Sequence, residues 1–162
     1  MSFSFSKYNL FYLHFTVLFL LIILFLRIYL ISITNNPLHF DEAQYWSWSQ
    51  DPKWGYFSKP PLLAWIISVS NYLCGNTETC IRLPVPILYF AATIFVFFST
   101  RIMTNNDITS SFSAIIFNLM PGITFSSFVT TTDVPLILFS SAFAFLFLII
   151  YKKENPSYFY FF

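Results

Sequence analysis

Charged residues are scarce in this chain of 162 residues: they form 9% of it, whereas soluble domains carry about 25%. Hydrophobic residues make up 57% of the sequence, and 23 residues are phenylalanine. This composition excludes an ordinary soluble domain and indicates an integral membrane protein. The formal net charge is +1 and the sequence contains no cluster of basic residues, which excludes recognition of a nucleic-acid backbone.

Glycine and cysteine are also scarce, with three and two copies. The sequence therefore contains no glycine-rich loop of the kind that cradles nucleotide phosphates. Both cysteines lie in one short segment, CGNTETC. If this segment faces an oxidising compartment, a disulfide between Cys74 and Cys80 is expected; the alternative is two unpaired small apolar side chains beside a membrane helix.

The first apolar run lacks the features of a cleaved signal peptide. It extends from Leu10 to Ile33 with no A-x-A-like site after it, whereas a signal peptide has an apolar core of about 7–15 residues. A helix of this length crosses a hydrocarbon core of about 30 Å. We therefore expect a retained transmembrane helix.

The remaining apolar runs predict an all-α integral membrane protein with four transmembrane helices. The third is the weakest, because it holds several serines and threonines and the pair Pro121-Gly122, which should kink or break it. The segment 61–73 is too short to span and is expected to form an interfacial helix within a first outer loop, residues 34–82. The four predicted spans are residues 10–33, 83–100, 108–129 and 134–151.

The positions of basic residues predict the orientation. Cytoplasmic loops are enriched in lysine and arginine, so we expect both termini in the cytoplasm. The 34–82 loop and the turn at Asp133 would then lie on the outer side of the membrane. Four basic residues fall on the predicted inner side: Lys7, Arg101, Lys152 and Lys153.

Arg27 is a cation inside the first predicted span, near its outer end. One interpretation is that its side chain snorkels to the outer headgroups. The other is a phosphate or carboxylate partner inside the helical bundle.

Residues 40–64, FDEAQYWSWSQDPKWGYFSKPPLLA, form a polar and charged island in the apolar chain. Asp41 and Glu42 open the island just after Pro37, which stops the first helix from continuing. Carboxylates at a membrane–water boundary can act as a general base or a metal ligand. Alternatively, Asp41 is the N-cap of a short helix.

Lys59 comes directly before Pro60-Pro61, which forces an extended entry into the interfacial segment. A lysine held there is suited to a lipid phosphate, or to ordinary contact with anionic headgroups. Four aromatic side chains of the island could stack on sugars or form an interfacial belt: Trp46, Trp48, Trp54 and Tyr56.

Asp133 lies in TTTDVPL, at the mouth of the fourth predicted span and on the same predicted side as Asp41. An acid beside a membrane helix is a functional candidate by default. It is equally suited to be a helix N-cap, with Pro135 in the first turn.

The order DEAQYW, GYFSKPPLLAW, RLP and TTDVPL, placed between the spans over residues 10–151, resembles the N-terminal part of type-C membrane glycosyltransferases. Specifically, it is similar to the dolichyl-phosphate-mannose protein mannosyltransferase family (glycosyltransferase family 39). The bacterial branch of that family includes the 4-amino-4-deoxy-L-arabinose transferases that modify lipid A. The resemblance implies a multispanning helical bundle with interfacial helices in the first outer loop.

By this resemblance, the chain uses a polyprenyl-phosphate-linked sugar and transfers it to a lipid, glycan or protein acceptor at the outer face of the bacterial inner membrane. Asp41 matches the catalytic acid that activates or positions the acceptor, and Glu42 is its companion. Lys59 matches the residue that contacts the donor phosphate. Asp133 matches a further acid, which we also expect to be catalytic.

Trp54 and Tyr56 belong to the expected substrate loop. Many relatives carry Asp or Glu where this chain has Ser58, so a metal site that relies on a carboxylate there is in doubt. A divalent metal thus remains open as a cofactor, and no other cofactor is predicted.

Family members continue beyond the spans present here, so the whole of residues 1–162 is expected to be one N-terminal portion of a transferase domain. The alternatives are an inactive remnant or one part of a split enzyme. A transporter fragment is disfavoured, because transporters place polar residues near the bilayer midplane and these acids gather at one face.

Overall fold

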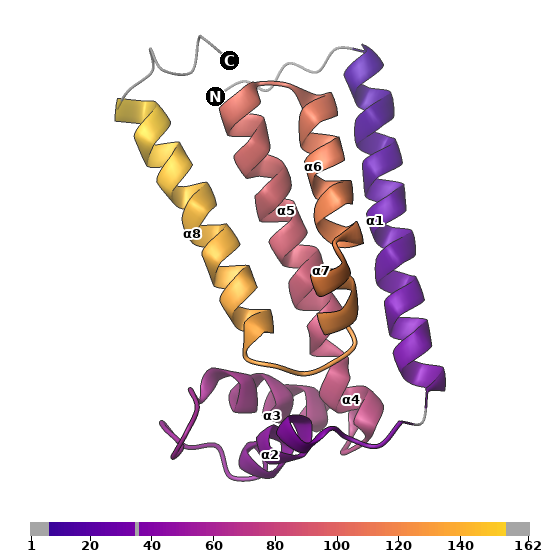
Figure 1. Ribbon diagram of the computed structural model, residues 1–162, viewed down its shortest axis with the longest axis vertical. Helices are drawn as coiled ribbons and strands as arrows, with labels where there is room; N and C mark the ends of the chain where they lie inside the picture. Colours follow the sequence, from indigo (N-terminus) through magenta and orange to yellow (C-terminus); the bar gives the residue numbers. More distant parts are fainter. Residues whose placement is uncertain (1–6, 35, 155–162) are drawn as a thin grey trace.

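The computed structural model describes residues 7–34 and 36–154, and in this part of the chain every regular element is a helix (Figure 1). The prediction of an all-α fold is confirmed. The helices are α1 (Lys7–Ile33), α2 (Phe40–Ser49), α3 (Leu62–Cys74), α4 (Glu78–Arg82), α5 (Pro84–Thr104), α6 (Asp107–Leu119), α7 (Pro121–Ser126) and α8 (Asp133–Glu154).

The long helices form a bundle that carries the short helices at one end. Figure 1 shows α1, α5, α6 and α8 running roughly side by side, while α2, α3 and α4 gather across the lower end of the view. Helix α5 is central, because it packs against α8 on one side and α6 on the other, and α6 in turn packs against α1. The polar island therefore lies at one end of the bundle, and the α5–α6 turn lies at the other.

Three helical stretches within the described residues are long and apolar enough to cross a membrane: Phe11–Ile33, Glu78–Thr104 and Asp133–Glu154. They correspond to three of the four predicted spans. The helix predicted over 61–73 is also present, as α3, and it packs against α2 and α4.

The predicted span 108–129 is divided rather than continuous. Helix α6 ends at Leu119 and α7 begins at Pro121, with Met120 between them in an extended conformation (φ −58°, ψ 129°). Proline has no amide hydrogen to donate and disfavours helical geometry in the residue before it. The break that the sequence predicts at Pro121 is thus confirmed, and it is complete rather than a kink.

Arg27 is buried inside the bundle, with 5% of its surface exposed. Its Nη1 and Nη2 atoms donate to the side-chain and backbone oxygens of Asn118, at 3.1 and 3.0 Å. The Asn118 amide continues this polar chain by donating to Thr93 Oγ1 at 2.8 Å. The snorkelling interpretation is therefore wrong, and the partner inside the bundle is an asparagine rather than a phosphate or carboxylate. Because α6 stops one residue after Asn118, its last carbonyls need donors that an apolar bundle does not otherwise supply.

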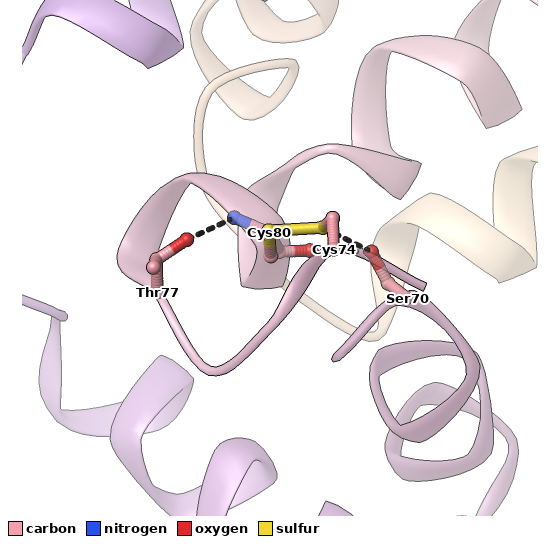
Figure 2. The surroundings of a disulfide bond; sticks show 4 residues. All are labelled: Ser70, Cys74, Thr77 and Cys80. Atoms are coloured by element: carbon pink, nitrogen blue, oxygen red, sulfur yellow. Dashed lines mark hydrogen bonds between the residues drawn. A yellow bond between two sulfur atoms is a disulfide. The ribbon is translucent and has the colours of Figure 1, made fainter. Parts of the chain in front are cut away.

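Cys74, at the end of α3, and Cys80, in α4, are joined by a disulfide (Figure 2). Thr77 caps α4 by accepting a hydrogen bond from the Cys80 amide, at 3.2 Å. Ser70 Oγ donates to the Cys80 carbonyl at 2.6 Å. Of the two alternatives for these cysteines, a disulfide or two unpaired side chains, the structure contains the disulfide, which links α3 to α4.

Candidate functional site

Helix α2 places the two adjacent acids of the island in its first turn, where carboxylates interact favourably with the helix dipole. The N-cap residue is His39, not Asp41, so the capping interpretation of Asp41 is wrong. Glu42 instead reaches back, and its Oε2 accepts a hydrogen bond from the His39 amide at 3.0 Å. The side chain of Asp41 is left free to point elsewhere.

Asp41 and Lys59, which are 18 residues apart in sequence, meet in an ion pair with 2.7 Å between Nζ and Oδ1. Both are partly open to solvent, with side chains 45% and 28% exposed. The lysine also lies over the Tyr45 ring, 4.9 Å from its centre, which is a favourable cation–π contact. The residue predicted to act on the acceptor and the residue predicted to bind the donor phosphate are therefore neighbours.

The ion pair stabilises the charged form of both groups. The hydrogen bond from Lys59 holds the pKa of Asp41 below its usual value, and the same bond raises the pKa of Lys59 above its usual value. At neutral pH the site consequently holds one carboxylate and one ammonium group in contact.

The loop between α2 and α3 is held against α2 by aromatic contacts. The Tyr56 ring stacks on Trp48, with 4.5 Å between ring centres and 8° between planes. The Tyr56 hydroxyl donates to the Trp48 carbonyl at 2.9 Å and accepts from the Lys53 amide at 3.0 Å. Of the two predicted substrate-loop residues, Tyr56 thus fixes the loop, while Trp54 is 89% exposed and lies edge-on to Trp65, with 5.1 Å between ring centres.

Glu42 is fully buried, and each of its oxygens accepts two hydrogen bonds. Oε1 accepts from Arg82 Nε and the Thr130 amide, both at 2.9 Å. Oε2 accepts from Arg82 Nη2 at 2.6 Å, beside the bond from His39. Burial alone would raise the pKa of Glu42, but the hydrogen bonds from Arg82, Thr130 and His39 outweigh it, so the pKa lies below its usual value.

Sequence reasoning missed Arg82, although it lies in the RLP segment. Besides the two bonds to Glu42, its guanidinium donates to the carbonyls of Asn36 and Pro37, both at 3.1 Å. An arginine at the start of a membrane span needs a partner, and this was the available signal. Its partner, 40 residues away in sequence, could not be read from the chain.

Asp133 is the first residue of α8 and is exposed. The segment before it is tied to the same cluster, because the Thr130 amide donates to Glu42 and the Thr130 hydroxyl donates to the Ile81 carbonyl at 3.2 Å. Glu42 thus connects the segment that carries Asp41 to the segment that carries Asp133.

The described residues contain no group of three or more His, Cys, Asp or Glu side chains placed to hold a metal ion. Asp41 and Glu42 diverge, one toward Lys59 and the other toward Arg82. Ser58 is exposed in the loop before Lys59.

Residues 58–162 match the protein family described as dolichyl-phosphate-mannose-protein mannosyltransferase. The chain is also 34% identical over 114 residues to the lipid A galacturonosyltransferase RgtD of Rhizobium johnstonii. That alignment covers 70% of this chain and 24% of RgtD, so the chain spans about a quarter of this curated relative. No solved structure matches the chain. Together, the apolar helices and the family match identify a membrane protein.

Proposed function

The chain belongs to the dolichyl-phosphate-mannose-protein mannosyltransferase family, and we propose that it carries the catalytic end of a membrane glycosyltransferase. The enzyme would move a sugar from a polyprenyl-phosphate donor to an acceptor hydroxyl at the outer face of the bacterial inner membrane. The observation that carries the proposal is the contact between Asp41 and Lys59 at one end of the apolar bundle.

Lys59 and Asp41 suit the two changes of charge in the transfer: the leaving phosphate gains negative charge, and the acceptor hydroxyl loses a proton. The bond from the anomeric carbon to the donor phosphate oxygen breaks, and a bond from the same carbon to the acceptor oxygen forms. The departing phosphate gains negative charge, which the Lys59 ammonium can stabilise. The acceptor hydroxyl loses its proton, which the Asp41 carboxylate can take as a general base.

The resting ion pair also gives an order of events. An incoming phosphate is a second anion for Lys59, whose ammonium has three donors and donates to Asp41 Oδ1 at 2.7 Å. When Lys59 turns to the phosphate, Asp41 loses its partner and becomes available to the acceptor. Donor binding would thus activate the base.

The disulfide and the charge distribution support the orientation in this proposal. Disulfides persist in oxidising compartments such as the bacterial periplasm, and Cys74–Cys80 lies at the same end of the bundle as the Asp41–Lys59 pair. At the opposite end, Lys152 donates to the Ile102 carbonyl at 3.2 Å, near Arg101. This arrangement agrees with basic residues on the cytoplasmic side.

A lipid is the acceptor class that we favour over a glycan or a protein. RgtD, the relative with 34% identity, is named for transfer of galacturonic acid to lipid A. For this chain, lipid A-like glycolipids are therefore the first acceptors to test, and polyprenyl-phosphate galacturonic acid is the first donor.

The test compares membranes from cells that produce the chain, cells that lack it, and cells that produce the Asp41→Asn variant at the same level. Each is incubated with radiolabelled polyprenyl-phosphate galacturonic acid, and label in the glycolipid fraction is counted. Label that requires the chain and disappears in the variant supports the proposal. Equal labelling in all three membranes contradicts it.

A further inference from the structure

We infer that Arg82 is a positioning residue, which acts through Glu42 to hold the Asp41 segment and the Asp133 segment in one fixed arrangement. The catalytic consequence rests on the function proposed above. The connection of three stretches of chain by one buried ion pair does not depend on that function.

The first connection is to the start of α2. Two of the four Arg82 hydrogen bonds reach the carbonyls of Asn36 and Pro37, and two reach the carboxylate of Glu42. Glu42 in turn accepts from the His39 amide, which precedes α2. The arginine thus holds the entry to α2 from both sides, and Asp41 lies inside the stretch that it holds.

The second connection is to the segment before α8. The Thr130 amide donates to Glu42 Oε1, the same oxygen that accepts from Arg82 Nε, both at 2.9 Å. Residues 42 and 130 are 88 apart in sequence. Three residues after Thr130 stands Asp133. Arg82 therefore reaches this segment through the carboxylate of Glu42.

The short helix that carries Arg82 is itself firmly held. Ile81 is buried in a cluster with Tyr45, Leu63 and Ile67, and its carbonyl accepts the Thr130 hydroxyl. Cys80, one residue earlier, is tied to α3 by the disulfide (Figure 2). Tyr45 is also the ring beneath Lys59. The same packing thus supports the ion pair of the site and the arginine that positions it.

Burial gives the pair a role in geometry rather than in net stability. A buried ion pair is often no more stabilising than apolar residues of the same volume, because desolvation offsets the attraction. Removing one partner, however, leaves a buried charge and unsatisfied donors. What the pair supplies is a single arrangement in which two segments distant in sequence meet.

The chain contains a matched control. Arg101 and Asp107 form another buried ion pair, at the opposite end of α5 and α6. Helix α5 is 21 residues long, which separates the two arginines by about 30 Å. The second pair is also a buried arginine–carboxylate pair, and it joins the two sides of the α5–α6 turn.

The first measurement is hydrogen–deuterium exchange on the chain in nanodiscs. The variants are Arg82→Met, Arg82→Lys, Glu42→Gln and the control Arg101→Met. We expect Arg82→Met to speed exchange over residues 127–133 by about tenfold, the loss expected for one hydrogen bond to a charged group. Arg101→Met should leave this segment unchanged. Unchanged exchange over 127–133 in Arg82→Met and Glu42→Gln would overturn the inference.

The Lys and Gln variants keep the test decisive if Arg82→Met does not fold. Arg82→Lys keeps the charge but loses the planar fork, and Glu42→Gln keeps an acceptor for the Thr130 amide. Each should therefore raise exchange less than Arg82→Met, with the change still confined to 36–43 and 127–133. A uniform rise across all helices would identify a merely structural role and contradict positioning.

The second measurement is sugar transfer from polyprenyl-phosphate galacturonic acid. We expect Arg82→Lys to lower kcat by roughly 10²-fold with little change in donor KM, the effect of displacing a catalytic group by about 1 Å. Arg101→Lys should keep wild-type kcat. Equal kcat in both variants contradicts positioning. Absence of transfer by the wild-type chain would contradict the proposed function alone, because the exchange measurement still decides the role of Arg82.

Discussion

A buried arginine is paired with a carboxylate near each end of α5: Arg82, the last residue of α4, lies just before the helix, and Arg101 lies in its last turn. The two ion pairs connect different parts of the chain. At one end, Arg101 pairs with Asp107, the first residue of the next helix. At the other end, Arg82 pairs with Glu42, 40 residues away. The Arg101–Asp107 pair joins the two sides of the turn between α5 and α6. The Arg82–Glu42 pair connects parts of the chain that are remote in sequence.

The difference lies in what the carboxylate also touches. Asp107 opens α6 within a turn that Asn106 caps by accepting from the amides of Ile108 and Thr109. Glu42 accepts in addition from His39 and from Thr130. A buried arginine–carboxylate pair thus stabilises a turn between consecutive helices at one end of the bundle. At the other end, the same kind of pair connects the segments of a candidate site.

The largest contrast should appear between the aspartates of the two ends. Asp41→Asn removes the proposed base and should lower sugar transfer by about 10²–10⁴-fold. Asp107→Asn makes the same change at the other end and should leave the rate per folded molecule unchanged. Radiolabel incorporation, normalised to folded protein, measures both, and similar losses in the two variants would contradict a specific role for Asp41.

Removing Arg82 should show how much free energy of unfolding is lost when one partner of a buried ion pair is absent. Arg82→Met leaves Glu42 charged, buried and without its cation, and should destabilise the fold by about 3–5 kcal/mol. Replacing both partners, with Glu42→Gln added to Arg82→Met, should recover part of this loss. Unfolding midpoints in detergent measure the effect, and an unchanged midpoint for Arg82→Met would show that the pair is not formed in solution.

The lysines of the two ends allow a third comparison. Lys59→Ala should weaken binding of polyprenyl phosphate by the worth of a charged hydrogen bond, about 1.5–3 kcal/mol. Lys152→Ala removes a lysine from the opposite end, where it donates to the Ile102 carbonyl, and should not change the affinity. Titration of nanodiscs with polyprenyl phosphate gives both values, and equal affinities would remove the phosphate role of Lys59.

The smallest expected effect is on pH dependence. Because Lys59 lowers the pKa of Asp41, the carboxylate stays ionised to a lower pH than an unpaired aspartate, whose pKa is about 3.9. Lys59→Met should raise the pKa of Asp41 and move the acid limit of residual transfer upward, whereas Lys152→Met should leave it in place. A pH–rate profile of each variant provides the measurement, and identical acid limits would show that the ion pair does not tune Asp41.

Local features of the fold could be predicted from the sequence because their causes lie within a few residues. The apolar runs predict the long helices, and Pro121 predicts where α6 must stop. The polar island at residues 40–64 predicts that charged groups cluster at one end of the helical bundle. Even here, local reasoning failed for Asp41, which it offered as a helix cap, because His39 occupies that position and Glu42 turns back to it.

Composition and periodicity were sufficient to locate three long apolar helices, the interfacial helix α3, the break at Pro121 and the charged residues of the island. The partners of the charged residues became known from the three-dimensional arrangement: Lys59 for Asp41, Arg82 and Thr130 for Glu42, and Asn118 for Arg27. These partners lie 18 to 91 residues apart in sequence. Helical periodicity and proline geometry act over a few residues. A buried charge is costly unless it is paired, and its partner is a donor or acceptor that tertiary packing places beside it, wherever that group lies in the sequence.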